Sequence, residues 1–222
     1  MEESPVDLYI SRVENAIRKA ESYNTKIRPH ALQMVGMSGL KNRIFMNEMI
    51  HADTRYLEVG VWLGSTFVSA LYKNTWDYAV AIDDFSEFGG QQEQFIDNCQ
   101  TNIIRDYDDG KSFCFINANC FKLSDTQKDL IKDINVYFYD GGHSQLEQYD
   151  ALAMYKSMMA KTFIYIVDDW NHKPAQVGTR DAIKNLGLKV HKEWEIFNPV
   201  PTVDDDYFNW WNGFYVAILE KP

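Results

Sequence analysis

The chain has 222 residues, of which 45% are hydrophobic and 24% are charged, so we expect a globular domain with a substantial core. Its formal net charge of -10 and its pI of about 4.9 make nucleic acid and anionic membrane surfaces poor partners. Three cysteines without CxxC spacing indicate free thiols. Because neither a secretory leader nor a long apolar run is present, we expect a cytoplasmic protein.

Two amphipathic helices are expected before the main domain, over residues 6–23 and 41–50, with a glycine-punctuated loop between them. The first helix either covers an edge of the core or caps a ligand. We therefore predict an N-terminal helical extension over residues 1–50, and a main domain over residues 51–222.

The most informative stretch covers residues 56–66. An apolar strand over residues 55–59 contains Glu58, two glycines follow at Gly60 and Gly64, and Ser65 and Thr66 open a helix that runs to residue 72. Glycine permits the backbone angles and close ligand contacts that a tight turn requires. Ser65 or Thr66 is expected to cap the helix. In open α/β sheets, ligands bind outside such strand ends.

A second strand, over residues 78–82, ends at Asp83 and Asp84. An acid about 20 residues beyond a glycine turn is where nucleoside-binding α/β folds hold a ribose diol, and Asp83 is the first acid after the strand. The alternative is a turn cap. Trp62 stands where a dinucleotide site has its second glycine, which disfavours nicotinamide and flavin cofactors.

The next elements are a helix over residues 91–104, a polar turn over 106–110 and a strand over 112–117 that leads to Asn119. A strand over residues 134–139 then runs into Asp140 and His143. A helix over residues 146–159 follows, and a strand over 162–167 ends at Asp168 and Asp169. Parallel strands would bring these acids to one edge of the sheet.

Three carboxylates at one edge repel one another unless a cation lies between them. Mg²⁺ or another hard divalent ion prefers such oxygen ligands, so Asp140, Asp168 and Asp169 are predicted to bind metal. The alternative is that each acid caps a helix. His143 can accept a proton near neutral pH and is the candidate general base, unless it is a surface residue. His172 is a weaker candidate.

The C-terminal part is expected to contain a helix over residues 176–186 and strands over 188–197 and 213–219. The acidic and aromatic insertion between these strands covers residues 198–212. Its aromatic side chains either stack on an acceptor or pack between subunits, which leaves a homo-oligomer open. They are Tyr207, Phe208, Trp210 and Trp211.

The pattern Glu58-x-Gly60-x-x-x-Gly64 resembles the first motif of class I S-adenosylmethionine (SAM) dependent methyltransferases. Asp140-Gly-Gly-His143 together with Asp168-Asp169 resembles the metal-dependent, macrocin-type sugar O-methyltransferase branch of that class, which is related to catechol O-methyltransferases. The similarity covers about residues 56–171. The chain departs from these relatives at Gly142 and Gln145, where they often have acids, and at the bulky Trp170.

The resemblance implies a Rossmann-like α/β fold, a three-layer sandwich with a mostly parallel seven-stranded sheet and an antiparallel last strand. It also implies which residues contact ligands. Cofactor-binding residues would be Glu58, Gly60, Gly64, Ser65, Asp83, Asn119 and Asp140; metal ligands would be Asp140, Asp168 and Asp169; His143 would be catalytic.

The expected function is therefore SAM-dependent O-methylation of a small hydroxylated acceptor, either a sugar or a catechol-like compound, with Mg²⁺ or another divalent metal. Two alternatives stay open at this point. One is a SAM-binding module without catalysis, and the other is a related hydroxylase-like enzyme.

Overall fold

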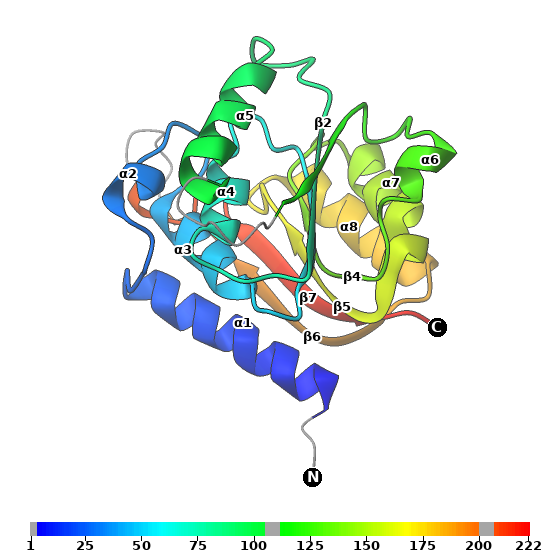
Figure 1. Cartoon of the computed structure of the whole chain (residues 1–222). Coiled ribbons are helices and arrows are strands. Elements are labelled where there is room, and N and C mark those ends of the chain that lie inside the picture. Colours follow the sequence, from blue (N-terminus) through cyan, green and yellow to red (C-terminus); the bar gives the residue numbers. More distant parts are fainter. Residues whose placement is uncertain (1–3, 105–111, 200–206) are drawn as a thin grey trace.

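The computed structural model describes residues 4–104, 112–199 and 207–222. Its helices are α1 (Pro5–Glu21), α2 (Pro29–Leu32), α3 (Leu40–Met49), α4 (Ser65–Leu71), α5 (Gln92–Cys99), α6 (Asp125–Lys128), α7 (Gln145–Tyr155) and α8 (Lys173–Asn185) (Figure 1). Its strands are β1 (Arg55–Val59), β2 (Tyr78–Asp83), β3 (Cys114–Asn117), β4 (Ile134–Tyr139), β5 (Met159–Val167), β6 (Lys189–Ile196) and β7 (Phe214–Glu220). A π-helical turn spans Gln100–Ile104 and a 3₁₀ turn spans Lys156–Met158.

The strands form one seven-stranded sheet in the order β3-β2-β1-β4-β5-β7-β6. Neighbouring strands from β3 to β5 run parallel, whereas β7 is antiparallel to both β5 and β6. The predicted mostly parallel sheet with an antiparallel last strand is thus confirmed. The strand order reverses between β1 and β4, and a sheet of this type binds ligands outside the strand ends at such a reversal.

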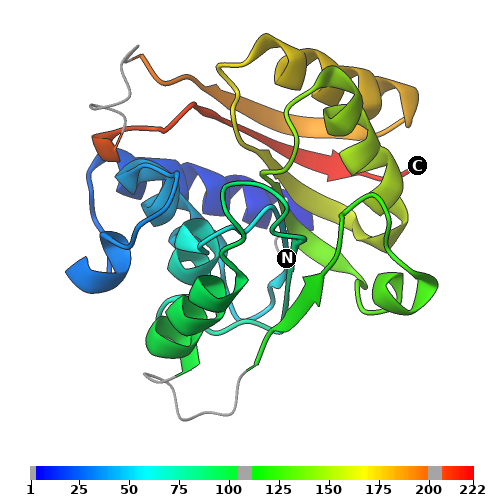
Figure 2. The same cartoon turned by 90° about the horizontal axis from the view of Figure 1, so that it is seen from above.

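Helices cover both faces of the sheet, which makes three layers (Figures 1 and 2). Successive strand residues point to opposite faces. Tyr56 and Phe138 therefore pack in one core with α1, α3, α4 and α5, while Leu57 and Tyr137 pack in a second core with α7 and α8. Because both faces of the central strands are buried, these strands read as continuous apolar runs in the sequence.

Serine residues set the starts of several helices. Ser4 Oγ accepts a hydrogen bond from the Asp7 N–H at the start of α1. Ser124 with Gln127 and Ser144 with Glu147 form reciprocal capping boxes at α6 and α7. Each box satisfies N–H groups that have no partner within the helix. The cap at Ser144 fixes where the loop after β4 ends.

Most predicted elements are present, and the differences have physical causes. The helix expected over residues 146–159 is wrong at its end, because α7 stops at Tyr155 and Met159 already pairs with Ile134 of β4. The strand expected from residue 112 begins at Cys114. Short helices α2 and α6 were not expected, although Ser124-x-x-Gln127 is a capping signal. The turn expected over residues 106–110 lies outside the described residues.

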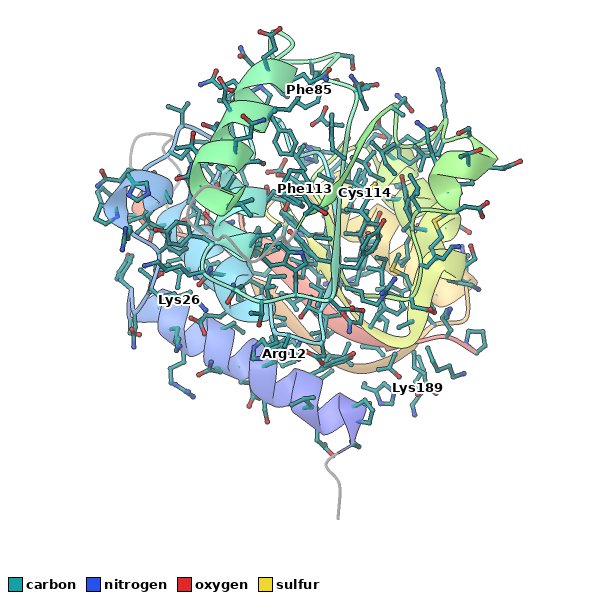
Figure 3. All side chains as sticks on the ribbon, in the orientation of Figure 1. Arg12, Lys26, Phe85, Phe113, Cys114 and Lys189 are labelled. Atoms are coloured by element: carbon teal, nitrogen blue, oxygen red, sulfur yellow. The ribbon has the colours of Figure 1, made fainter. Side chains whose placement is uncertain are left out.

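An aromatic cluster holds α5 on the sheet. Phe95 of α5 lies with its ring centroid 6.1 Å from Phe85, 6.2 Å from Phe113 and 5.3 Å from Phe115. Phe85, which follows β2, and Phe113, which precedes β3, are labelled in Figure 3. The cluster therefore fixes the loop that follows β2, which carries Asp83 and Asp84.

The first helix packs on the core at the opposite end from these loops. It contacts α3, β5 and β7, and Arg12, labelled in Figure 3, donates to Asp53 Oδ1 at 2.9 Å. The division of the chain at residue 50 stays a prediction. Among the described helices, none has the length and apolarity that a membrane span requires.

Candidate functional site

A cavity of about 580 Å³ lies at the carboxyl ends of β1, β2, β4 and β5. Residues from seven separate segments of the chain line it, as expected for the reversal point of the sheet. They are Met37, Val59, Gly60, Val61, Trp62, Ser65, Thr66, Ile82, Asp83, Asp84, Ser86, Glu87, Phe88, Ala118, Asn119, Cys120, Phe121, Asp140, Gly141, Gly142, His143, Glu147, Asp168, Asp169, Trp211 and Asn212.

The turn between β1 and α4 forms the floor of the cavity. Gly60 has a φ of +88°, and a Cβ at this position would lie 1.9 Å from the Asp140 carbonyl oxygen. Gly64 is the N-cap of α4 with a φ of +82°. The predicted cap by Ser65 or Thr66 is therefore wrong, because a left-handed glycine already ends the turn. Gly60 thus allows the loops after β1 and β4 to touch.

Glu58 lies beneath this floor and does not line the cavity. Its side chain is fully buried and accepts hydrogen bonds from the hydroxyl groups of Tyr56 and Thr66. Burial raises the pKa of Glu58 to about 8, although both hydrogen bonds act to lower it. Thr66 does line the cavity, so it connects the buried acid to the site.

The loop before α3 forms one wall of the cavity. Arg43 is buried, and its guanidinium donates to the carbonyl oxygens of four residues of this loop and its approach, Leu32, Met34, Gly36 and Ser38. Burial lowers the pKa of Arg43 to about 10, which still leaves it charged. Ser65 Oγ lies 2.8 Å from Ser38 Oγ. These bonds hold Met37 over the site.

Polar groups gather where β2 and β3 end. Asp83 accepts from the Trp62 N–H at 2.8 Å and from the Phe85 N–H at 2.7 Å. Asn119 donates to Asp84 Oδ2 at 3.2 Å, and its own oxygen accepts from the Phe121 N–H. Both Asp83 and Asn119 therefore combine the turn role with a place in the cavity wall. A carboxylate has further lone pairs that can accept from a ligand.

The loop after β4 places His143 between two acids. Its Nδ1 lies 2.6 Å from Asp169 Oδ2, and its Nε2 lies 3.8 Å from Asp140 Oδ1. Burial lowers the pKa of His143, but hydrogen bonding and charge from the two acids outweigh burial and raise it to about 10. In this arrangement the imidazole is charged at neutral pH, and its role as general base stays a prediction.

Glu147 reaches the same loop from the first turn of α7. Its carboxyl lies where a Cβ at Gly142 would be, with Oε1 2.2 Å from that point. Tyr139 donates to the Gly142 carbonyl oxygen at 3.1 Å, which fixes the loop from the other side. The loop has no acid at position 142, and the carboxylate of Glu147 occupies the space beside Gly142 instead.

Asp168 is the most buried acid of the cavity wall, with 5% of its surface exposed, and its Oδ1 has no hydrogen-bond partner. Burial, together with the charges of Asp140 and Asp169, raises its pKa well above the ordinary value. Burial likewise raises the pKa of Asp140 to about 6. The acids therefore converge as predicted.

Their geometry does not form a ready metal site. Among the described residues, no three His, Cys, Asp or Glu side chains are arranged to hold a metal ion. His143 lies between Asp140 and Asp169, where an ion bridging them would bind. The predicted metal set thus does not fit this arrangement.

The C-terminal insertion contributes its last residues to the site. Trp211 and Asn212 line the cavity, whereas Trp210 is buried against Phe45 and Phe214 in the core. Residues 200–206 lie outside the described residues. Trp170, which departs from the resemblance, also belongs to the core, where it stacks on Tyr215 at 4.3 Å.

The structure brings together all but two of the predicted site residues. Gly60, Ser65, Asp83, Asn119, Asp140, His143, Asp168 and Asp169 line one cavity, whereas Glu58 and Gly64 lie behind its wall. His172 is not among the lining residues. Four further wall residues were not predicted: Met37, Asp84, Phe88 and Glu147. Of these, only Asp84 had a signal in the sequence, which is its place beside Asp83.

No family model matches the chain, and no curated protein matches its sequence. Solved structures are similar in fold. A candidate methyltransferase named SMU.776, complexed with S-adenosylhomocysteine (SAH), aligns with a TM-score of 0.58 and 9% identity over 84% of this chain and 50% of that chain. The chain thus spans half the length of that relative.

Two other similar structures match more of their own length. A Corynebacterium glutamicum protein aligns with a TM-score of 0.57 and 12% identity over 94% of this chain and 97% of that chain. Sp1610 of Streptococcus pneumoniae, a candidate tRNA (m1A22) methyltransferase in complex with SAM, aligns with a TM-score of 0.54 and 10% identity, covering 85% of this chain and 73% of that chain. The chain has the Rossmann-like α/β fold of these proteins.

Proposed function

We propose that the protein is a SAM-dependent methyltransferase that methylates a hydroxyl group of a small acceptor. The observation that carries this proposal is the cavity at the strand-order reversal, where most of the residues expected to bind the cofactor meet. Its volume of about 580 Å³ lies within the range of cofactor sites.

The polar groups of the cavity suit the parts of SAM. Asp83 and Asp84 would accept hydrogen bonds from the ribose hydroxyls, and Asn119 would face the adenine. Trp62 Nε1 is buried without a partner in the turn after β1, and it is a free donor for an oxygen of the amino-acid part. Two of the similar structures hold SAH or SAM, which supports this assignment.

When bound, SAM supplies an electrophilic methyl group on its sulfonium and becomes SAH once that group has left. The protein has to align the acceptor oxygen with the methyl carbon and to receive the hydroxyl proton. Because the His143 imidazole already carries its proton, we assign proton removal to a carboxylate oxygen of Asp140, which lies beside His143 in the cavity wall. Met37 and Trp211 would exclude water from the reacting atoms.

Cofactor binding is the first test. Isothermal titration should detect binding of SAM and SAH, and Asp83→Asn should weaken SAH binding about tenfold, because one charged hydrogen bond to the ribose is lost. Asp125→Asn is the matched control, since the Asp125 side chain is 100% exposed in α6. A folded protein that binds neither compound would refute the proposal.

Metal dependence and acceptor chemistry are tested by turnover. Mass spectrometry of products from a panel of hydroxylated acceptors should show a mass gain of one methylene, roughly 14 Da, as expected for methyl transfer. The same assays with a chelator and with added Mg²⁺ test the predicted metal, for which the arrangement of His143 offers no ready site. A product that gained oxygen instead would favour the hydroxylase-like alternative.

A further inference from the structure

The cavity wall carries acids without matching basic side chains. Of the described residues that line it, seven are Asp or Glu, one is a histidine (His143), and none is Lys or Arg. The chain has 22 Lys and Arg residues in total, so a shortage of basic residues in the sequence does not explain why the described wall residues include none. The potential inside the cavity is therefore negative, which favours cationic ligands.

Most of these acids already have partners within the protein. Asp83 accepts two backbone N–H bonds, Asp84 accepts from Ser86 and Asn119, and Glu147 accepts from Ser144. The charge that is not balanced locally lies at the ends of β4 and β5. One histidine serves two acids there, and a third acid is added by Asp168.

Asp168 is the acid with an unused acceptor. It is 5% exposed, it lines the cavity, and its Oδ1 has no hydrogen-bond partner. A buried carboxyl oxygen without a donor destabilises the site unless a ligand supplies the donor. An ammonium group has three N–H donors and a positive charge, so it satisfies both the hydrogen bond and the charge.

We propose that the acceptor is a small aromatic hydroxyl compound that carries a protonated amine, and that Asp168 receives the amine. This inference rests on the proposed function, and it names the acceptor class for the same site. An anionic acceptor is disfavoured, because phosphate and carboxylate groups cannot donate to Asp168 and are repelled by its neighbours.

The aromatic part of the proposal follows from the rest of the wall. Trp62, Phe88, Phe121 and Trp211 all line the cavity. Trp62 and Phe88 form an edge contact with ring centroids 6.0 Å apart, and Phe88 is 62% exposed. An exposed aromatic ring at a cavity is available for stacking, and its face also attracts a cation.

A divalent metal would satisfy the same carboxyl oxygen, but it requires more of the site. A metal ion needs several ligands at fixed geometry, and no three of the described His, Cys, Asp or Glu side chains offer it. A protonated amine needs only one free acceptor atom in a region of negative potential. Asp168 supplies the acceptor atom, and its neighbours Asp140 and Asp169 contribute to the negative potential.

Three phenols of similar size and different charge test the inference. Isothermal titration of the SAH-loaded protein in EDTA would compare tyramine, which is cationic, with neutral 4-ethylphenol and anionic 4-hydroxyphenylacetate. We expect tyramine to bind about tenfold more tightly than 4-ethylphenol, and 4-hydroxyphenylacetate to bind most weakly. Added salt should change this preference only slightly, because a buried ion pair is screened much less than an exposed one.

Asp168→Asn should reduce tyramine affinity about tenfold and leave 4-ethylphenol within about twofold, with Asp125→Asn as the unchanged control. SAH binding by the variant reports that the variant is folded. If it is not folded, the comparison of the three phenols on the natural protein still tests the inference. Equal binding of the three phenols, binding of none, or preference for the anion would overturn the inference. Failure of SAH to bind would instead refute the proposed function.

Discussion

Replacement of Glu58 by glutamine tests the electrostatics beneath the site. Glu58 is fully buried, and its oxygens accept from Tyr56 and Thr66. Burial raises its pKa to about 8, from an ordinary value of 4.5. Glutamine has the same shape and resembles the protonated acid in carrying one acceptor and one donor side. The substitution therefore removes the titration while keeping the packing.

The sign follows from proton linkage. Between the two pKa values the unfolded chain has released the Glu58 proton while the folded chain retains it, so the free energy of unfolding falls as pH rises. The folded pKa of about 8 lies about 3.5 above 4.5, which at 1.36 kcal/mol per pKa step corresponds to at most about 5 kcal/mol. The contribution is complete below the unfolded pKa and is lost as pH rises through about 8.

Urea unfolding between about pH 5 and pH 9 measures this difference. The natural protein and Glu58→Gln should have similar stability near pH 5, and the variant should become several kcal/mol more stable by pH 8 or 9. The other acids titrate in both proteins and cancel in the comparison. Glu93→Gln, at an exposed site in α5, should follow the natural protein throughout. Parallel curves for Glu58→Gln would refute the assignment of a raised pKa.

Two further predictions concern the walls of the cavity. Gly60→Ala should destabilise the protein by about 3 kcal/mol or more, because the new Cβ would lie 1.9 Å from the Asp140 carbonyl oxygen. The control Gly89→Ala, with a similar φ of +91° and more space, should cost about 1 kcal/mol. Equal losses of stability in urea unfolding would contradict the argument from this contact. Arg43→Lys should lower the free energy of unfolding by about 3 kcal/mol, because it leaves buried carbonyl oxygens without donors. The control Arg18→Lys, at an exposed site, should lower it by less than about 0.5 kcal/mol. A decrease below about 1 kcal/mol for Arg43→Lys would show that other contacts hold the loop.

The sheet was predictable because its signals are local and repeated. β2, β4 and β5 are apolar runs that lead directly to acids, which is typical of parallel strands buried on both faces. The end of α7 was not predictable in the same way. Met159 follows a helical pattern, but its pairing with Ile134 of β4 is a long-range contact that overrides local propensity.

The acids of the site were predictable from position alone, since residues that directly follow parallel strands meet at one edge. The covering loops were not. Met37 reaches the cavity because Arg43 binds the carbonyl oxygens of a loop with no regular structure, and Trp211 reaches it from an insertion with no strand periodicity. Backbone hydrogen bonds to one buried guanidinium leave no periodic trace in the sequence.

The chemical state of the acids is a property of the assembled site. The sequence indicates that Asp140 and Asp169 are neighbours. In the folded chain His143 lies between them, with its Nδ1 2.6 Å from Asp169, so that a side chain of the protein provides the first cation. The oxygen of Asp168 that has no partner then sets what a ligand must bring, which is a hydrogen-bond donor with positive charge. Under the proposed function, charge balance at the ends of β4 and β5 links the fold to the class of acceptor.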